Sequence, residues 1–360
     1  MNLLNNVSYA GKILKANITK RWFPLTVSLT VTNRCNLRCI YCYGAYYNRE
    51  VKDFPTKFWL DLIDEVHSMG TKLIHLEGGE PLLRDDIGTF IQHIKDKNML
   101  CRMNSNGYLV PKKISEIERL DSLCISLDGD EESNDKNRGE GSYKKIITAI
   151  KTARQHGLPV LTSTTLTSNN IENGAIEHVL SLAREIDFGA QFNFLYEQTT
   201  DHTDDPACRV REEAIKKALV KLIDYKKKGW PIFYSMATYN NALNWPVSYN
   251  VKKFTSQDPA PPEFEYIPCY MGKLMCFVDG DGMVYPCGEH IGKFPALNIL
   301  DVGFKKAWEN LARHKDCLTC YNTCFNEYNQ VFSCRIGVWS NNFFNLIKNK
   351  GRKTVRKRND

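Results

Sequence analysis

Strand-like and helix-like segments alternate along the first two thirds of the chain, and this alternation restricts the fold more than any other feature. Short apolar and β-branched runs predict six strands, at 25–31, 72–76, 99–103, 122–127, 159–166 and 190–195. Amphipathic patterns between or after them predict helices at 56–69, 85–97, 111–119, 142–156, 171–186 and 207–229. A βα unit repeated six times predicts an α/β protein with a parallel sheet, either doubly wound or curled into a barrel. In both arrangements functional residues follow the carboxyl ends of the strands.

The alternation fades near residue 230, and the sequence beyond it is of a different kind. A Pro-rich stretch occupies 258–264, and seven of the thirteen cysteines fall between Cys269 and Cys334. We therefore expect a domain boundary in this region. The expected segments are an N-terminal amphipathic segment (1–21), the barrel or sheet (22–230), a linker (231–265), a small Cys-rich domain (266–335) and an amphipathic helix with a basic tail (336–360).

Charge and targeting signals narrow the class of protein. The formal net charge of +7 is concentrated in a basic run between Lys348 and Arg358, and no basic stripe crosses the body, so we expect no nucleic acid partner. The N-terminus lacks a secretory signal, which predicts a cytoplasmic protein. Thirteen cysteines in a reducing compartment indicate metal or redox chemistry. Apolar residues at helical spacing near both ends, with basic charge at the C-terminus, suggest contact with a membrane surface.

Three cysteines lie in one short polar loop after the first predicted strand. Cys35, Cys39 and Cys42 have the spacing Cys-x3-Cys-x2-Cys. Three thiolates on a four-iron cluster leave one iron open to a chelating amine and carboxylate. A structural zinc site would need a fourth Cys or His at short spacing, and none follows nearby. A zinc-binding or purely structural role for the three cysteines is the alternative.

This loop, with the aromatic Tyr41 before its third cysteine, resembles the signature of the radical S-adenosylmethionine (SAM) superfamily. The resemblance implies a partial (β/α)6 TIM-like barrel and a [4Fe-4S] cluster on Cys35, Cys39 and Cys42. It also implies that SAM is bound and reductively cleaved to a 5′-deoxyadenosyl radical, the cofactor thus supplying the difficult chemistry. A low-potential electron donor such as flavodoxin or ferredoxin would be a partner.

A second motif, Gly78-Gly79-Glu80-Pro81, follows the second predicted strand and resembles the family's GGEP motif. The glycines allow a close backbone approach, and a carboxylate with nearby carbonyls can receive an ammonium group, so the resemblance implies binding of the methionyl amine of SAM here. An ordinary Gly-Gly turn is the alternative. Further candidates for contacts with SAM lie after later strands, where turn pairs are also common: Asn104, Asn106, Ser126, Asp128 and Arg138.

The C-terminal cysteines resemble the auxiliary-cluster extension called SPASM, or its shorter Twitch form. Cys269-x12-Gly282-x4-Cys287 is followed, after a gap, by Cys317-x2-Cys320. We expect these four cysteines to hold one auxiliary [4Fe-4S] cluster, with zinc as the rival metal. The later block is shorter than in full SPASM, so the other cysteines there are treated as alternates or ligands of a second cluster: Cys276, Cys324 and Cys334.

These features together predict a radical SAM iron–sulfur oxidoreductase. It would oxidatively modify or cross-link a peptide or a small molecule by hydrogen abstraction, and no particular catalytic residue is predicted. The segment before the barrel is too short for a leader-recognition domain, which weakens the peptide alternative. Two other hypotheses stay open: a radical SAM enzyme acting on a lipid or isoprenoid at the membrane surface, and a non-catalytic zinc-stabilised binding protein. His75, Cys101, Cys124 and Cys208 are predicted to be structural.

Overall fold

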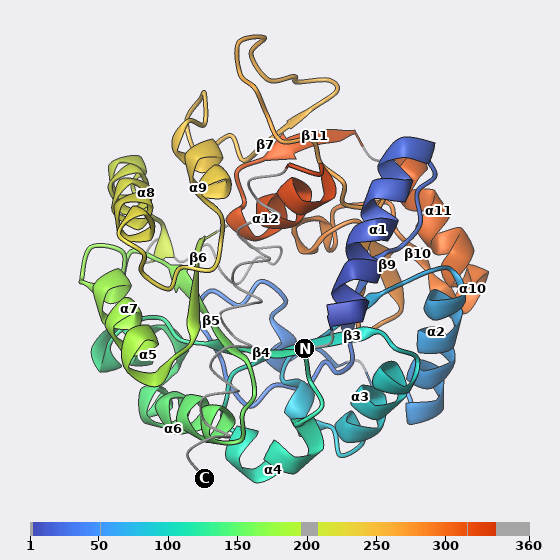
Figure 1. The fold of residues 1–360 in the computed structure, drawn as a ribbon, viewed down its shortest axis with the longest axis horizontal. Coiled ribbons are helices and arrows are strands. Elements are labelled where there is room, and N and C mark those ends of the chain that lie inside the picture. Colours follow the sequence, from blue (N-terminus) through green and yellow to red (C-terminus); the bar gives the residue numbers. More distant parts are fainter. Residues whose placement is uncertain (1–2, 51, 196–207, 315, 336–360) are drawn as a thin grey trace.

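A computed structural model describes residues 3–50, 52–195, 208–314 and 316–335, and one large curved sheet dominates it (Figure 1). Nine strands follow the order β10-β9-β8-β1-β2-β3-β4-β5-β6. The run from β8 through β6 is parallel, and helices cover its convex side (Figure 1). The α/β prediction, with a partial barrel of six βα units, is confirmed.

All six predicted strands and six predicted helices are present, with ends that differ by a few residues. The strands are β1 (Thr26–Thr30), β2 (Leu73–Glu77), β3 (Leu100–Ser105), β4 (Ser122–Ser126), β5 (Val160–Leu166), β6 (Gly189–Phe194), β7 (Lys253–Thr255), β8 (Met275–Val278), β9 (Met283–Tyr285), β10 (Leu297–Asn298) and β11 (Cys317–Cys320). The helices are α1 (Leu3–Thr19), α2 (Thr56–Ser68), α3 (Ile87–Asp96), α4 (Val110–Ile117), α5 (Glu131–Arg138), α6 (Ser142–Gln155), α7 (Ala175–Ile186), α8 (Glu212–Lys227), α9 (Met236–Leu243), α10 (Ile299–Val302), α11 (Phe304–His314) and α12 (Thr323–Phe332).

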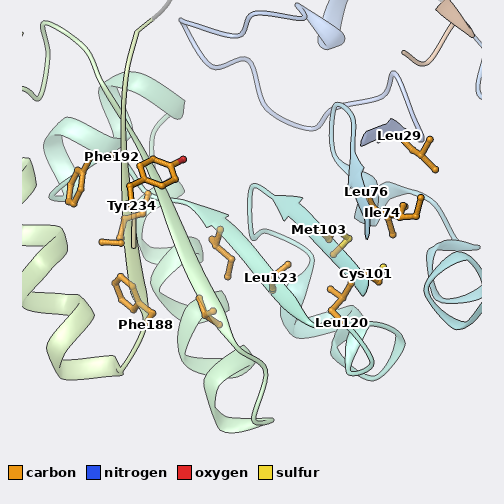
Figure 2. Packing of buried hydrophobic residues seen from close by; sticks show 14 of the residues in the cluster. Leu29, Ile74, Leu76, Cys101, Met103, Leu120, Leu123, Phe188, Phe192 and Tyr234 are labelled. Atoms are coloured by element: carbon orange, nitrogen blue, oxygen red, sulfur yellow. The ribbon is translucent and has the colours of Figure 1, made fainter. Parts of the chain in front are cut away.

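Alternation of side chains along the strands separates an apolar outer face from a polar inner one. Leu29, Ile74, Met103 and Leu123 are fully buried in the layer between sheet and helices (Figure 2). The residues between them point to the concave side and stay partly accessible. We call this side the inner face; its members on β2 to β6 are His75, Glu77, Arg102, Asn104, Cys124, Ser126, Leu161, Ser163, Thr165, Gln191 and Asn193.

The Cys-rich segment, here called the extension (residues 266–335), does not stand apart from the barrel. Its strand β8 pairs in parallel with β1, and β9 and β10 continue the sheet antiparallel beyond it. Helix α12 lies across the concave side (Figure 1). Its Thr323 hydroxyl donates to the Phe192 carbonyl on β6 at 3.2 Å, and its Tyr328 hydroxyl lies 2.7 Å from Nε2 of His75 on β2. The extension therefore completes the sheet and covers the inner face.

The predicted N-terminal amphipathic segment forms α1, which packs on the extension. Ile13 and Ala16 are buried against Met271, Leu274 and other residues of a second apolar cluster. The Asn17 amide donates to the Phe332 carbonyl at 2.8 Å. The predicted C-terminal helix and basic tail, 336–360, lie outside the described residues. No helix in the described part of the chain is long and apolar enough to cross a membrane.

Candidate active site

The cysteine loop leaves the carboxyl end of β1, where the parallel fold places functional residues. Cys35, Cys39 and Cys42 are all partly accessible. Burial raises the pKa of the Cys35 thiol to about 12, and the charges of Cys39 and Cys42 act in the same direction, so the three thiols lie near one another. The Ile40 amide donates to the Asn137 carbonyl at the end of α5 at 3.1 Å, which anchors the loop.

The GGEP loop lies directly against the chain that enters this cysteine loop. The Gly79 amide donates to the Thr32 carbonyl at 3.0 Å, and the Glu80 amide donates to the Arg34 carbonyl at 2.8 Å. A Cβ atom on Gly79 would lie 2.2 Å from the Arg34 carbonyl oxygen, and one on Gly78 would lie 2.6 Å from that of Thr32. Only glycine permits this approach of two backbones.

The Glu80 carboxylate points inward and has partners within the protein. Its side chain is 0% exposed. It accepts hydrogen bonds from the Leu82 amide at 3.1 Å, the Ser105 hydroxyl at 2.9 Å and the Asn106 amide at 2.7 Å. Burial nevertheless raises its pKa to about 7. Glu80 therefore joins the GGEP loop to the end of β3.

The other polar candidates on β3 and β4 fall into two groups. Asn106 supports the cysteine loop, because its amide donates to Oδ1 of Asn36 at 2.7 Å. Asn104 is exposed and Ser126 partly exposed on the inner face. These two side chains remain accessible to a ligand there.

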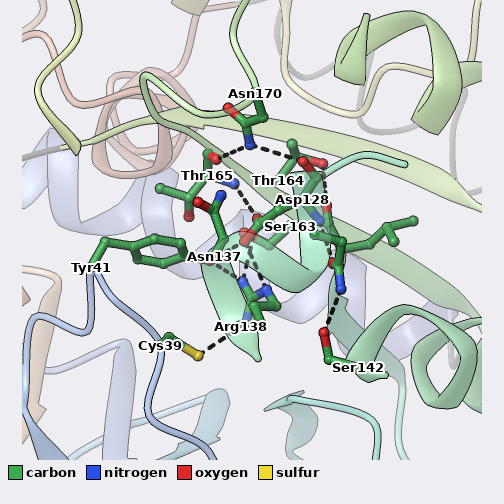
Figure 3. Close-up of polar contacts among 12 residues, drawn as sticks. Cys39, Tyr41, Asp128, Asn137, Arg138, Ser142, Ser163, Thr164, Thr165 and Asn170 are labelled. Atoms are coloured by element: carbon green, nitrogen blue, oxygen red, sulfur yellow. Dashed lines mark hydrogen bonds and ion pairs between the residues drawn. The ribbon is translucent and has the colours of Figure 1, made fainter. Parts of the chain in front are cut away.

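Asp128 and Arg138 form a buried ion pair beneath the cysteine loop (Figure 3). Arg138 Nε lies 2.8 Å from Oδ2 of Asp128, and the two side chains are 7% and 0% exposed. Asp128 also accepts from the Tyr41 hydroxyl at 2.5 Å and from the Thr165 amide at 2.9 Å. Arg138 donates to the Tyr41 hydroxyl as well. The pair therefore holds the loop through Tyr41, and the Asp128 carboxylate has partners within the protein.

Arg138 also affects the pKa of the Cys39 thiol. Its Nη1 lies 3.8 Å from Cys39 Sγ (Figure 3). Burial raises the pKa of Cys39, and the guanidinium opposes that shift while Asp128 adds to it. A cation beside a buried thiol favours the thiolate, the form that binds metal.

Four cysteines of the extension line one cavity. Cys269, Cys287, Cys317 and Cys320 surround it together with Phe325 and other side chains. Burial raises the pKa of Cys287, with additional contributions from the charges of Cys269 and Cys320. The four cysteines expected to hold an auxiliary cluster therefore share one site.

The three alternate cysteines lie elsewhere. Cys276 is 0% exposed within β8, in the main hydrophobic core, which argues against a role as a ligand. Cys334 lies beside α1, 3.6 Å from Nδ2 of Asn17. Cys324 faces the inner face, where it interacts with Tyr234 and lies near Cys124 of β4. None of the three lines the cavity of the other four.

Two contacts between the barrel and the extension were not predicted. Arg49 Nη1 lies 2.8 Å from Oδ2 of Asp279, and both side chains are largely buried. The same guanidinium donates to Oδ1 of Asn33, just before the cysteine loop, at 3.2 Å. His75, predicted to be structural, carries the second contact through Tyr328. The sequence gives no local signal for either, because the partners are far apart in the chain.

The two cysteine sets offer the thiols that iron–sulfur clusters require. Among the described residues, no group of three or more His, Cys, Asp or Glu side chains is close enough to hold one metal ion. A cubane cluster instead binds each thiolate to a different iron, so its ligands stand farther apart. The loop offers three thiols with a cation beside one of them, and the extension offers four around a cavity.

Residues 29–183 match the family model of the radical SAM superfamily, a span that contains the cysteine loop, the GGEP loop and Arg138. The chain carries a radical SAM domain and is an iron–sulfur enzyme. It uses a [4Fe-4S] cluster and SAM, and its extension is of the SPASM or Twitch type. The hypothesis of a non-catalytic zinc-stabilised protein is therefore wrong.

Curated relatives match the enzyme over most of their length. It is 28% identical over 304 residues to the AdoMet-dependent heme synthase of Methanosarcina barkeri, covering 80% of this chain and 82% of that protein. It is 24% identical over 303 residues to the mycofactocin maturase MftC of Mycolicibacterium smegmatis, covering 80% and 70%.

Solved structures share the fold of the enzyme. Streptococcus suis SuiB bound to its precursor peptide SuiA matches with a TM-score of 0.63 and 16% identity, over 86% of this chain and 70% of that chain. The structure of anSMEcpe with bound AdoMet matches with a TM-score of 0.60 and 20% identity, over 79% and 80%.

Proposed function

We propose that the enzyme oxidatively modifies a peptide or a polar small molecule on the inner face of its sheet, with an auxiliary [4Fe-4S] cluster on Cys269, Cys287, Cys317 and Cys320. The observation that carries this proposal is the position of α12, which follows the last two of these cysteines and covers the inner face. A substrate between the sheet and α12 would lie between the two cysteine sets.

The residues of the chain have different roles in the proposed reaction. When bound, the loop cluster and SAM supply the oxidant that removes a hydrogen atom from the substrate, and an auxiliary cluster could accept the electron left behind. Cys35, Cys39 and Cys42 would hold the first cluster, and Arg138 favours the Cys39 thiolate. Backbone groups of Gly78 and Gly79 would position SAM, and we place Asn104 and Ser126 as its further contacts.

Relatives support both a peptide and a small molecule as substrate. SuiB was solved with a precursor peptide and MftC is named a maturase, whereas the Methanosarcina barkeri relative is named a heme synthase. The inner face favours a polar substrate in either class, because Cys124 and Leu161 are its two apolar members on β2 to β6. An isoprenoid would find few apolar contacts there.

A second candidate property is attachment to a membrane surface, carried by the outer side of α1. Val7, Leu14 and Ile18 lie on one side of this helix and are 61%, 50% and 72% exposed. Exposed apolar residues in line on a helix are typical of interfacial helices. Flotation with vesicles of anionic phospholipid tests this property: the wild type should float, and a Val7→Ser/Leu14→Ser/Ile18→Ser variant should not. Equal behaviour of the two proteins would contradict it.

Anaerobic reconstitution tests the main proposal. The protein should bind about eight irons, the content of two [4Fe-4S] clusters. A low-potential donor, flavodoxin or ferredoxin by class, should then support cleavage of SAM to 5′-deoxyadenosine and methionine. Candidate substrates are short peptides encoded by neighbouring genes and small molecules made by the enzymes that those genes encode. Mass spectrometry should show loss of a hydrogen pair from the true substrate.

Matched cysteine variants separate the two clusters. Cys39→Ala should abolish SAM cleavage, and Cys320→Ala should remove about half of the iron while leaving SAM cleavage measurable. Zinc in place of iron at the extension, or an unchanged iron content in Cys320→Ala, would refute the auxiliary cluster.

A further inference from the structure

The inner face carries two charged groups that are not paired with each other. Glu77 lies at the end of β2, where its Oε1 accepts from the Ser28 hydroxyl at 3.3 Å and lies 3.6 Å from Nδ1 of His75. Arg102 lies on β3 between Cys101 and Met103, whose side chains point to the outer helices (Figure 2). The strand register pairs Arg102 with His75, so Arg102 lies one inward-facing position deeper than Glu77.

Arg102 has no partner in the part of the chain that the structure describes. Its guanidinium forms no hydrogen bond and no ion pair there, although most other arginines of the barrel do. The side chain is only partly exposed. An arginine held inside a fold, away from bulk water, normally has an acceptor within reach, because desolvating an unpaired charge is unfavourable.

The groups around Arg102 come from four elements. Its positive charge lowers the pKa of Tyr9 on α1, His75 on β2, Cys124 on β4 and Tyr328 on α12 relative to what burial alone would give. None of these is an anion at neutral pH, since burial raises the pKa of both tyrosines and of Cys124 and lowers that of His75. The charge of Glu77 also acts on His75, Cys124 and Tyr328, but Glu77 forms no ion pair with Arg102, so the guanidinium has no direct anionic partner among the described residues.

We propose that Arg102 binds a carboxylate of the substrate on the inner face, so that the substrate is an acidic molecule. This inference rests on the proposed function, because it places the substrate between the sheet and α12. A guanidinium presents paired N–H donors that match both oxygens of a carboxylate. Glu77 lies one inward-facing position nearer the cysteine loop and would repel the carboxylate of the substrate. This repulsion orients the acidic end of the substrate toward Arg102 and away from SAM.

The same chemistry could come from two sources, and two probes distinguish them. One probe is iron coproporphyrin III, which bears propionates; the other is a synthetic glutamate-containing pentapeptide. Each is compared with an uncharged counterpart, the porphyrin methyl ester and the glutamine version of the peptide. Binding to the reconstituted enzyme is measured by equilibrium dialysis. The variants are Arg102→Gln, Arg102→Lys and, as a matched control, Arg119→Gln, a surface arginine paired with Asp96.

One acidic probe should bind the wild type and Arg119→Gln equally, and bind Arg102→Gln at least about tenfold more weakly. Its uncharged counterpart should not distinguish the proteins, and Arg102→Lys should retain part of the affinity. Arg102→Gln should also melt at or above the temperature of the wild type, because no partner is lost. Equal binding by Arg102→Gln, or no preference for either acid over its counterpart, would overturn the proposal. If SAM cleavage persists in that case, the proposed function still stands; if the wild type cleaves no SAM, it is the proposed function that fails.

Discussion

Replacing Arg138 by methionine isolates the contribution of the buried ion pair under the cysteine loop. The change keeps an unbranched side chain of similar length and removes the charge. Asp128, which is 0% exposed, then keeps Tyr41 and the Thr165 amide as donors but loses its counter-ion. Removing one partner of a buried pair costs about 3–5 kcal/mol of unfolding free energy. For a protein of this size that is a fall of about 4–7 °C in melting temperature.

The same variant should also load iron less readily at neutral pH. Without the guanidinium, burial and the Asp128 charge both raise the pKa of Cys39, so less thiolate is present. Reconstitution at higher pH should restore part of the iron. The assays are differential scanning fluorimetry and iron content after reconstitution across a pH series.

Two controls decide whether the ion pair is responsible. Arg119→Met breaks an exposed pair with Asp96 and should change the unfolding free energy by less than about 1 kcal/mol. Asp128→Asn combined with Arg138→Met removes both charges and should be more stable than Arg138→Met alone. Equal losses in Arg138→Met and Arg119→Met, or no recovery in the double variant, would refute this reasoning.

Three further predictions concern the glycine loop, the core thiol and a buried carboxyl. Gly79→Ala should abolish cluster binding, because its Cβ would lie 2.2 Å from the Arg34 carbonyl oxygen. The control Gly11→Ala has open space around its Cβ in α1 and should stabilise the protein by up to about 1 kcal/mol. Iron content and melting temperature check both variants. Cys276→Ala should keep the full iron content and lower the unfolding free energy by about 1–2 kcal/mol through lost packing. Cys287→Ala should lose about half of the iron. Equal iron losses in the two variants would contradict the assignment of Cys287 as a ligand and Cys276 as a core residue. Burial raises the pKa of Glu80 to about 7 in the folded protein. The protonated carboxyl therefore contributes stability that is fully present below the ordinary carboxyl pKa and is lost as the pH rises through about 7. The contribution of Glu80 to stability should therefore fall between about pH 4.5 and pH 7, by at most about 3 kcal/mol. A titration of melting temperature should lack this slope in Glu80→Gln.

Local periodicity was sufficient for the barrel, since each βα unit carries its own pattern within a short stretch of sequence. The strands around Leu29, Leu76 and Leu123 alternate between an apolar layer and a polar face, and the structure places them accordingly. The extension was harder to predict. Strand β8 is short, and the apolar run Met275–Val278 was not assigned as a strand that joins β1, because its partner lies about 250 residues earlier.

The site shows the same division. The resemblance to SPASM or Twitch grouped Cys269, Cys287, Cys317 and Cys320, which line one cavity. The sequence does not indicate that the Glu80 side chain points inward, because a carboxylate after two glycines could bind a ligand or hold the loop to β3. The core position of Cys276 could have been predicted, since its neighbours Met275, Phe277 and Val278 are all apolar.

The pairing of β1 with β8 has a consequence for the way the protein is made. The first strand of the barrel remains an open edge until residues 275–278 have left the ribosome. At about 5–20 residues synthesised per second, the wait is on the order of 10–50 s. During that interval the cysteine loop at the end of β1 has one neighbouring strand instead of two, and Arg49 has no Asp279 to bind. The geometry of the cysteine loop is thus completed by residues synthesised about 250 positions after β1.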